Sequence, residues 1–320
     1  MLKRNIKKFD VVSIGGATSD FMFYSGEGEL ISTNNLTKQK LLAFEYGAKI
    51  IADKLYPTYG GGAANTAVAF ARLGLKTGII CQVGWDEEGR KAVENLKKHR
   101  VDSSLIKYDK HNLTAFSMIL TVKGAENEHI VFAHRGASDT LSNKDLQLDK
   151  IASDWLYISS LPKINWAGIM ASVIKTKSKI AWNPGNAQLQ QLAKMGKYLP
   201  KVKLFLLNKD EALEFKKLKD IKGLIKYIRG LGPEIVVITD GSAGAYVYDG
   251  HKYYFMKALK VKSVDTVGVG DAFSSAFTGA LIYGKNIKTA LSWGIKNSAS
   301  VIGKVGAQNG LLDKRRLAQR

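Results

Sequence analysis

The chain has 320 residues, of which 45% are hydrophobic and 24% charged, so it can bury a large core and is not disordered over most of its length. No apolar run reaches the roughly 18 residues of a membrane span, and the basic N-terminus lacks the apolar stretch of a secretion signal, which predicts a cytoplasmic protein without a membrane partner. The net charge of +20 favours anionic ligands, but the lysines are scattered and no recognised nucleic-acid motif accompanies them, which argues against nucleic acid.

Strands and helices alternate over the first hundred residues, and a hairpin then interrupts them. The predicted elements are a strand over 9–14, a helix from about Ala63 to Gly74, a strand over 77–83 and a helix over 87–100. Residues 114–122 and 128–133 have strand composition and are joined by a polar connection at 123–127, which predicts a hairpin. The lone cysteine, Cys81, falls in a predicted buried strand and is interpreted as a core residue.

The alternation resumes in the second half of the chain. The predicted strands cover 154–159, 179–182, 203–207 and 233–239, the predicted helices cover 166–175 and 187–194, a hairpin pairs 243–248 with 252–255, and two helices begin near Asp271 and Ile287. Such alternation predicts a largely parallel sheet with helices on both faces and ligands at the carboxyl ends of the strands. The hairpin and an irregular segment over 21–59 do not fit the alternation, so we expect them to form a small cover.

The strongest local signal is the segment 264–273, in which Gly268 and Gly270 precede Asp271 and an apolar helix. Two glycines let the backbone turn so that several N–H groups point at one spot, where the positive end of the helix dipole also lies. This pattern predicts an anion site. A carboxylate there suits a base that takes a proton from an attacking hydroxyl while the amides hold a phosphoryl group. The alternative is that Asp271 only caps the helix.

Three weaker signals accompany it. The glycines and alanines of 60–67 let a ligand approach a helix start, where Asn65 could bond sugar hydroxyls. Asn208 and Glu211 follow a strand and could position phosphate and hydrated magnesium, although the same spacing predicts a capping box. Residues 239–244 offer a hydroxyl and glycine amides at the end of another strand, and alone they predict a hairpin turn.

Together and in this order, these segments resemble the PfkB/ribokinase family of carbohydrate and nucleoside kinases. Residues 60–74 are similar to the first family signature, and 265–273 are similar to the second, usually Asp-Thr-x-Gly-Ala-Gly-Asp-Ala-Phe. The Asn208-x-x-Glu211 spacing matches a family motif, and 239–244 look like the nucleotide-phosphate loop. The resemblance extends over 11–310 and implies an α/β fold: a ribokinase-like, Rossmann-type sandwich with a mostly parallel sheet and a small β lid.

The resemblance also implies a donor, an acceptor and site residues. Magnesium-ATP would be the donor, and a hydroxyl of a small sugar or related polyol would be the acceptor. The residues that it assigns by position are Asp20, Gly61 and Asn65 for the substrate; Asp271, Gly268, Val269 and Gly270 for catalysis; and Asn208, Glu211, Thr239, Gly241, Gly244 and Asn297 for ATP. Asp271 would be the general base beside an anion hole of backbone amides, and Glu211 would hold magnesium through water. Asp265 and the 305–310 turn resemble the loop that binds a monovalent cation, such as potassium, in some members.

We further expect a single domain over 1–320, with a lid formed by segments about 20–59 and 112–135 through which a homodimer could pair. Two departures concern the stretch between Asp20 and Gly60, which is longer than in plain ribokinases, and the valines at 267 and 269, which are bulkier than the usual Thr and Ala. Arg135 is the nearby candidate for clamping an acidic acceptor. The alternatives that stay open are an adenosine or other nucleoside kinase and a non-catalytic basic binding protein.

Overall fold

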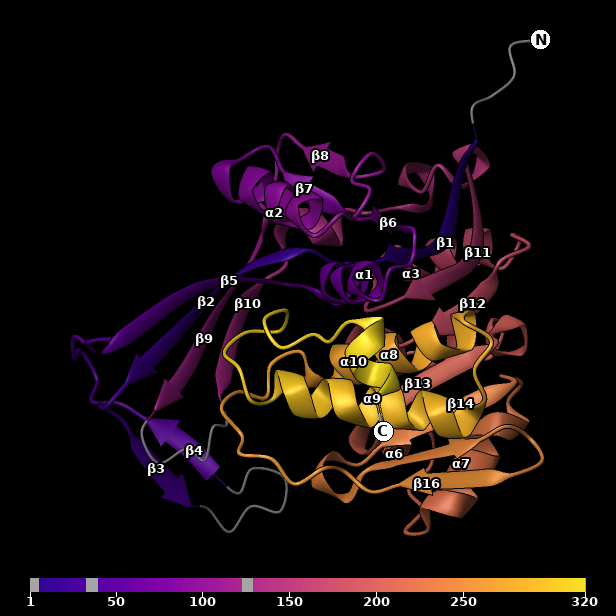
Figure 1. The fold of residues 1–320 in the computed structure, drawn as a ribbon. Helices are drawn as coiled ribbons and strands as arrows, with labels where there is room; N and C mark the ends of the chain where they lie inside the picture. The colour runs from indigo at the N-terminus through magenta and orange to yellow at the C-terminus, as the bar shows by residue number, and fades with distance from the viewer. Residues whose placement is uncertain (1–5, 33–39, 123–128, 320) are drawn as a thin grey trace.

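The computed structural model describes residues 6–32, 40–122 and 129–319, and its centre is an eight-stranded sheet (Figure 1). The strands are β1 (Lys7–Ile14), β6 (Thr77–Ile80), β11 (Ile151–Ile158), β12 (Lys179–Trp182), β13 (Leu204–Asn208), β14 (Ile235–Thr239), β15 (Ala245–Tyr248) and β16 (Tyr253–Met256). Their order is β16-β15-β14-β13-β12-β11-β1-β6. All neighbouring strands are parallel except in the pairs β14–β15 and β15–β16, which are antiparallel. The predicted, mostly parallel sheet is confirmed.

Helices cover both faces of this sheet because its strands are apolar on both sides. Trp155 and Tyr157 of β11 pack with the helices α1 (Gly62–Arg72), α8 (Val269–Ile282), α9 (Ile287–Val301) and α10 (Lys314–Ala318). The alternate residues Leu156 and Ile158 pack with α3 (Trp166–Val173), α4 (Asn186–Leu189), α5 (Leu192–Met195), α6 (Lys209–Phe215) and α7 (Ile221–Gly230). Side chains that alternate along a strand thus build two cores, one per face.

A second, four-stranded sheet projects from one end of the molecule (Figure 1). We call it the small sheet; it contains β2 (Thr18–Ser25), β5 (Lys54–Gly60), β9 (Ala115–Val122) and β10 (Ile130–His134) in the order β10-β9-β2-β5. The predicted hairpin is confirmed as β9 and β10, while its connection at 123–127 and Glu128 lie outside the described residues.

The expectation that 21–59 is irregular is wrong. This segment contains most of β2 and most of β5, together with the hairpin β3 (Glu29–Ser32) and β4 (Lys40–Ala43). Long-range pairing decides the outcome, because β2 is bonded along one edge to β9 and along the other to β5. Pro57 is tolerated in β5 because that strand lies at the edge of the sheet.

Three element boundaries also differ from the predictions. The strand expected at 77–83 is divided into β6 and β7 (Gln82–Gly84) at Cys81, where β7 leaves to pair with β8 (Lys107–Asp109). The helix expected at 187–194 is divided into α4 and α5, and α8 begins at Val269, ahead of Asp271. Burial raises the pKa of the Cys81 thiol to about 12, as befits a core residue. Within the described residues, no helix is long and apolar enough to span a membrane.

Candidate active site

The N-termini of α1 and α8 meet at the edge of the sheet where the parallel strands end. Gly61, with φ of +88°, precedes α1, and a Cβ on it would lie 2.5 Å from the Gly16 carbonyl oxygen. Gly268, with φ of +73°, precedes α8, and a Cβ there would lie 2.2 Å from the Cβ of Ala307. Both turns therefore require glycine. The α1 amides of Ala63 and Ala64 donate to the Gly16 carbonyl, whereas the first-turn amides of Gly270 and Asp271 in α8 have no partner within the helix.

Asp271 is the third residue of α8 and does not cap it. The N-cap is Gly268, which has no side chain to bond the first turn, so the capping interpretation of Asp271 is wrong. Its carboxylate instead faces α1, where Oδ2 accepts a 2.8 Å hydrogen bond from Asn65 Nδ2. Burial raises the pKa of Asp271 to about 6, against the opposing effect of the Asn65 bond. A carboxylate with such a pKa is ionised at neutral pH and still basic enough to accept a proton.

Two cavities adjoin at Asp271 and Gly268. One has a volume of about 400 Å³ and is bordered by Asp20, Gly61 and Asn65 among others. The other, of about 210 Å³, is bordered by a set that includes Asn208, Glu211, Thr239 and Gly270. Gly268 and Asp271 border both. The structure therefore brings these residues, from five separate chain segments, to two sides of a single carboxylate.

The larger cavity lies between the first strand-to-helix turn and the small sheet. Asp20 reaches it from β2, and Ser117 reaches it from the paired position on β9. Burial raises the pKa of Asp20, while the hydroxyls of Thr18 and Ser117 oppose the rise. On the far side, His129 Nδ1 lies 3.3 Å from Thr266 Oγ1 and so links the small sheet to the loop before α8. Ser117 and His129 escaped the sequence analysis because strand register decides where they point.

The smaller cavity lies at the carboxyl ends of β13 and β14. Asn208 and Glu211 form the capping box that was the alternative interpretation: Glu211 N donates to Asn208 Oδ1 and Asn208 N donates to Glu211 Oε2, each at 2.8 Å. Among the described residues, Glu211 Oε1 keeps no partner and remains available to a ligand. Burial raises the pKa of Glu211, the bond from Asn208 lowers it, and the charge of Asp271 raises it further. A cation near Glu211 would offset the cost of burying its negative charge and would lower its pKa.

Other predicted ligand residues have contacts of their own. Gly241 lies in a short 3₁₀ turn, Gly241–Ala243, that joins β14 to β15, and Gly244 packs on the β16 backbone at Met256, so the hairpin-turn interpretation of this loop is confirmed. Asn297 is buried; it donates to the Ala272 carbonyl at 2.7 Å and accepts from Leu312 N at 2.8 Å. Gly241, Gly244 and Asn297 are not among the described residues that border the two cavities. Their contacts with ATP stay predictions.

Asp265 and the 305–310 turn do meet. Asp265 is buried, and its carboxylate accepts from Val267 N at 3.0 Å and from Gly306 N at 2.7 Å. The nearby Val269 borders neither cavity within the described part of the chain, and its N–H lies 3.5 Å from the Thr266 carbonyl. Gly270 is different, because a Cβ on it would meet nothing within 4 Å. The open approach to the predicted anion site is therefore over Gly270.

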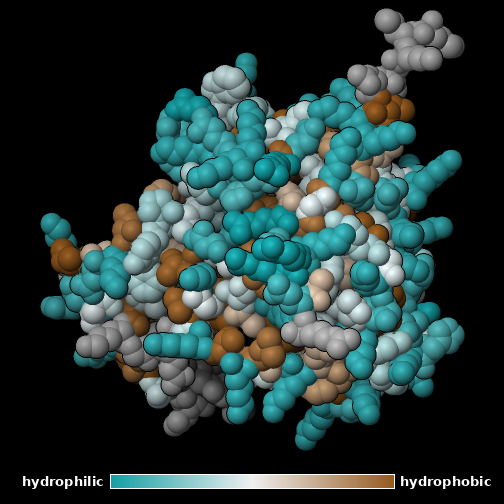
Figure 2. All heavy atoms as spheres, viewed as in Figure 1, coloured by the Kyte–Doolittle hydropathy of each residue, from teal (hydrophilic) through white to brown (hydrophobic). Residues whose placement is uncertain are grey.

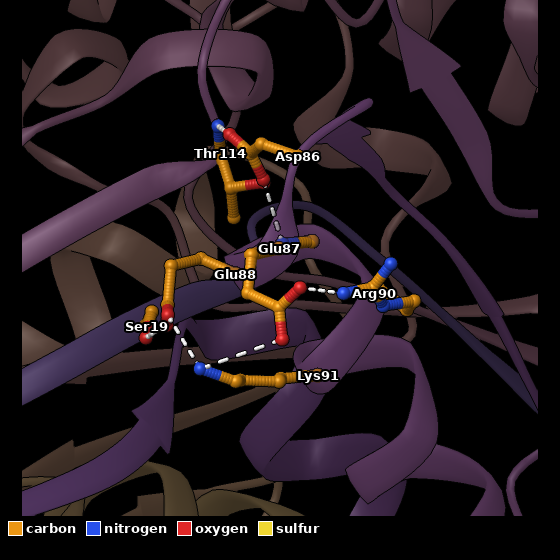
Figure 3. Close-up of polar contacts among 8 residues, drawn as sticks. Ser19, Asp86, Glu87, Glu88, Arg90, Lys91 and Thr114 are labelled. Carbon is orange, nitrogen blue, oxygen red and sulfur yellow. Dashed lines mark hydrogen bonds and ion pairs between the residues drawn. The ribbon is translucent and has the colours of Figure 1, made fainter.

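The small sheet is fixed at its base to α2 (Glu87–Lys98), as Figure 3 shows. Asp86 caps α2 and also accepts from Thr114 N at 2.7 Å and Thr114 Oγ1 at 2.6 Å, just before β9 begins. Ser19 of β2 donates to Glu88 Oε2 at 2.5 Å. The Gly84-x-Asp86 turn before a helix was the signal that could have pointed to this anchor. As a result, β2 and β9, which both border the larger cavity, are anchored to the same end of α2.

The doubly wound sheet, the projecting small sheet and the carboxylate between two cavities define the ribokinase class of α/β enzymes. Solved structures agree on the fold: a Methanocaldococcus jannaschii nucleoside kinase matches with a TM-score of 0.79 and 21% identity, covering 97% of each chain. A Thermotoga maritima ribokinase matches with a TM-score of 0.80 and 19% identity, covering 97% of this chain and 98% of the other.

The sequence comparisons name the family. A Haemophilus influenzae ribokinase is 29% identical over 262 residues, which is 79% of this chain and 84% of that protein. The model of the pfkB family carbohydrate kinases matches residues 29–315, so the chain belongs to that family. It is accordingly a phosphotransferase with an alcohol group as acceptor.

Proposed function

We propose that the protein transfers the γ-phosphate of ATP to a hydroxyl of a small sugar or related polyol, with Asp271 as the general base. The observation that supports this most is the position of Asp271 on the boundary of the two cavities. The cavity with Asp20 and Asn65 offers hydroxyl-bonding groups to an acceptor, and the cavity with Glu211 lies against the first turn of α8, where a phosphate would bind.

The smaller cavity, with Glu211, fits a nucleoside triphosphate bound with magnesium. An Escherichia coli protein of this fold, with a TM-score of 0.78 and 17% identity over 96% of this chain, was crystallised with ATP and magnesium. Here the amides of Gly268 and Gly270 would hold the transferring phosphoryl group, and Glu211 Oε1 would hold magnesium through water. Magnesium, when bound, would neutralise phosphate charge. A monovalent cation such as potassium would bind near Asp265, which already joins the 305–310 turn to the α8 loop.

The chemical step then needs few groups. The acceptor hydroxyl gives its proton to Asp271 as its oxygen attacks the γ-phosphorus, and the bond from that phosphorus to the bridging oxygen of ADP breaks. Asn65 holds Oδ2 of the base at 2.8 Å, which leaves Oδ1 facing Gly62 and the larger cavity. The small sheet would act as a lid that excludes water during transfer and so limits hydrolysis of ATP.

The acceptor is proposed to be neutral. Asp20 would repel an acidic substrate, and Arg135, the candidate clamp for one, borders the larger cavity but already pairs with Asp139 at 2.6 Å. Turnover should therefore appear with pentoses, hexoses or nucleosides in a substrate panel and be unaffected by Arg135→Ala. Turnover only with sugar acids or sugar phosphates, abolished by Arg135→Ala, would contradict a neutral acceptor. Within this panel, turnover with nucleosides and not sugars would select the nucleoside-kinase alternative.

Replacing Asp271 by Asn tests the base. The variant keeps the size of the side chain and an oxygen that can accept from Asn65, so ATP should still bind, and more tightly if charge repulsion matters. Turnover should fall by roughly 10²–10⁴-fold, because proton acceptance is lost. ATP affinity by calorimetry and phosphoryl transfer are measured side by side. Near-normal turnover in D271N would remove Asp271 from the mechanism, and ATP binding without turnover in the unmodified protein would favour the non-catalytic binding protein.

A further inference from the structure

A row of three side-chain amides connects α2 to the carboxylate of Asp271. Asn95 Nδ2 donates to Gln308 Oε1 at 2.9 Å, Gln308 Nε2 donates to Asn65 Oδ1 at 3.1 Å, and Asn65 Nδ2 donates to Asp271 Oδ2 at 2.8 Å. Gln308 and Asn65 are only 6% and 5% exposed. The row joins four segments that are far apart in sequence, and water has little access to compete for its two inner members.

The row has one direction. An ionised carboxylate can only accept, so Asn65 must turn its NH₂ group toward Asp271 and its oxygen toward Gln308. Gln308 must then donate to that oxygen and accept from the next residue, and Asn95 supplies the donor. If Gln308 could not donate, the buried Asn65 oxygen would lose its donor, and the orientation that directs the Asn65 NH₂ group at Asp271 would lose that support. The orientation of Asn65 therefore depends on a residue that does not touch the base.

The loop that holds Gln308 is itself fixed against α8. Gly306 N donates to Asp265 Oδ2 at 2.7 Å. Ala307 packs so closely on Gly268 that a Cβ added to Gly268 would lie 2.2 Å from the Cβ of Ala307. One short turn therefore places Ala307 against Gly268, on one side of Asp271, and Gln308 against Asn65, on the other.

We propose that Gln308 is a positioning residue for the general base. Provided that Asp271 is the base proposed above, Gln308 keeps Asn65 donating to Oδ2 and so keeps Oδ1 directed at the acceptor hydroxyl. Asn65 is the group that opposes the burial of the Asp271 carboxylate. Within the described part of the chain, the other titratable groups that interact with Asp271 are Glu211 of α6 and Tyr157 of β11, whose hydroxyl donates to Ser274 Oγ. Neither supplies a donor to replace Asn65.

Gln308→Glu tests the proposal because it preserves size and the bond from Asn95 but cannot donate when ionised. We expect kcat to fall roughly 10- to 100-fold, as for a displaced catalytic group, with the acid limb of the kcat–pH profile moved to higher pH and the KM for ATP little changed. Asn95→Asp and Asn95→Leu form a matched pair of variants at the end of the row farthest from Asp271. Asn95→Asp would draw the NH₂ of Gln308 toward itself and reverse the row, so it should move the acid limb further than Asn95→Leu.

A second readout does not depend on turnover. The carboxyl pKa of Asp271, followed by ¹³C NMR with D271N to assign the signal, should rise in Q308E. An unchanged carboxyl pKa and an unchanged acid limb would overturn the proposal, as would equal effects of the two Asn95 variants. A raised pKa in Q308E together with near-normal turnover in D271N would leave the positioning of Asp271 standing and overturn its role as the base.

Discussion

At the scale of single residues, burial of the Asp271 carboxylate makes the stability of the protein depend on pH. The pKa of Asp271 is raised from 3.8 to about 6, so the folded protein binds this proton more tightly than the unfolded chain does. The stability contributed by the bound proton is complete below about pH 4 and is lost as the pH rises through 6. At neutral pH the ionised carboxylate therefore destabilises the fold, as functional groups often do.

Asp271→Asn should consequently stabilise the protein by roughly 1–3 kcal/mol above pH 7, since it removes the buried charge and keeps an acceptor for Asn65. The advantage should disappear toward pH 4, where Asp271 is protonated. Urea unfolding of both proteins across this range measures it. Glu94→Gln, at an exposed carboxylate on α2, is the matched control and should show no such trend. A D271N variant that is less stable at every pH would contradict the assignment of burial as the dominant effect.

At the scale of elements, the junction of α2 with β9 depends on one hydroxyl. Thr114 is buried, donates to Asp86 Oδ1 and accepts from Gly84 N at 2.9 Å. Burial alone would raise the pKa of Asp86, but the bonds from Thr114 and Gly89 outweigh it and hold this pKa below its usual value. A lowered pKa adds stability at neutral pH that is lost as the pH falls through the folded-state value.

Thr114→Val should therefore cost about 1–3 kcal/mol at pH 7, because the buried Gly84 N–H loses its acceptor and the partly buried Asp86 loses one of its donors. The loss should shrink in acid, where Asp86 is protonated in both proteins. Denaturant midpoints at pH 7 and near pH 3 give the comparison. Thr121→Val on β9, the strand that follows Thr114, is the control, since its hydroxyl has no partner among the described residues. Equal losses for both variants would show that the hydroxyl at 114 adds nothing specific.

At the scale of the whole molecule, the small sheet has an outer face whose apolar side chains stay partly exposed among the residues that the structure describes. The residues bordering the larger cavity alternate along its strands with apolar residues that point the other way: Phe21, Phe23, Phe116, Met118, Leu120, Ile130 and Phe132. Phe132 is 55% exposed and Phe116 is 39% exposed. Figure 2 shows brown, apolar areas on the side where Figure 1 places the small sheet, on a surface that is otherwise mostly hydrophilic.

We expect a second copy of the chain to cover this face, because a large apolar patch is unfavourable in water and the edge strand β10 offers unpaired backbone groups. Sedimentation velocity at micromolar concentration should give a dimer for the unmodified protein and a monomer for Phe132→Glu. Ile164→Glu, which adds the same charge at an 88% exposed position elsewhere, should remain dimeric. A monomeric unmodified protein would rule out pairing through the small sheet.

The sequence by itself determined the doubly wound sheet and the individual motifs. Apolar strands and helix stops are local patterns, and so are the Gly268-x-Gly270-Asp271 turn and the Asn208-x-x-Glu211 box, because each depends on the backbone freedom or hydrogen bonding of a few neighbouring residues. Their order along the chain then sufficed to indicate the family.

Only the tertiary structure decided how these motifs meet. The bond between Asn65 and Asp271 joins residues 206 positions apart, and the bond between Gln308 and Asn65 joins residues 243 apart. The strands within 21–59 and the direction of Ser117 toward the larger cavity likewise depend on pairing between β2, β5 and β9. Register and helix approach are set by the packing of whole elements against one another, and no short stretch of sequence contains that information.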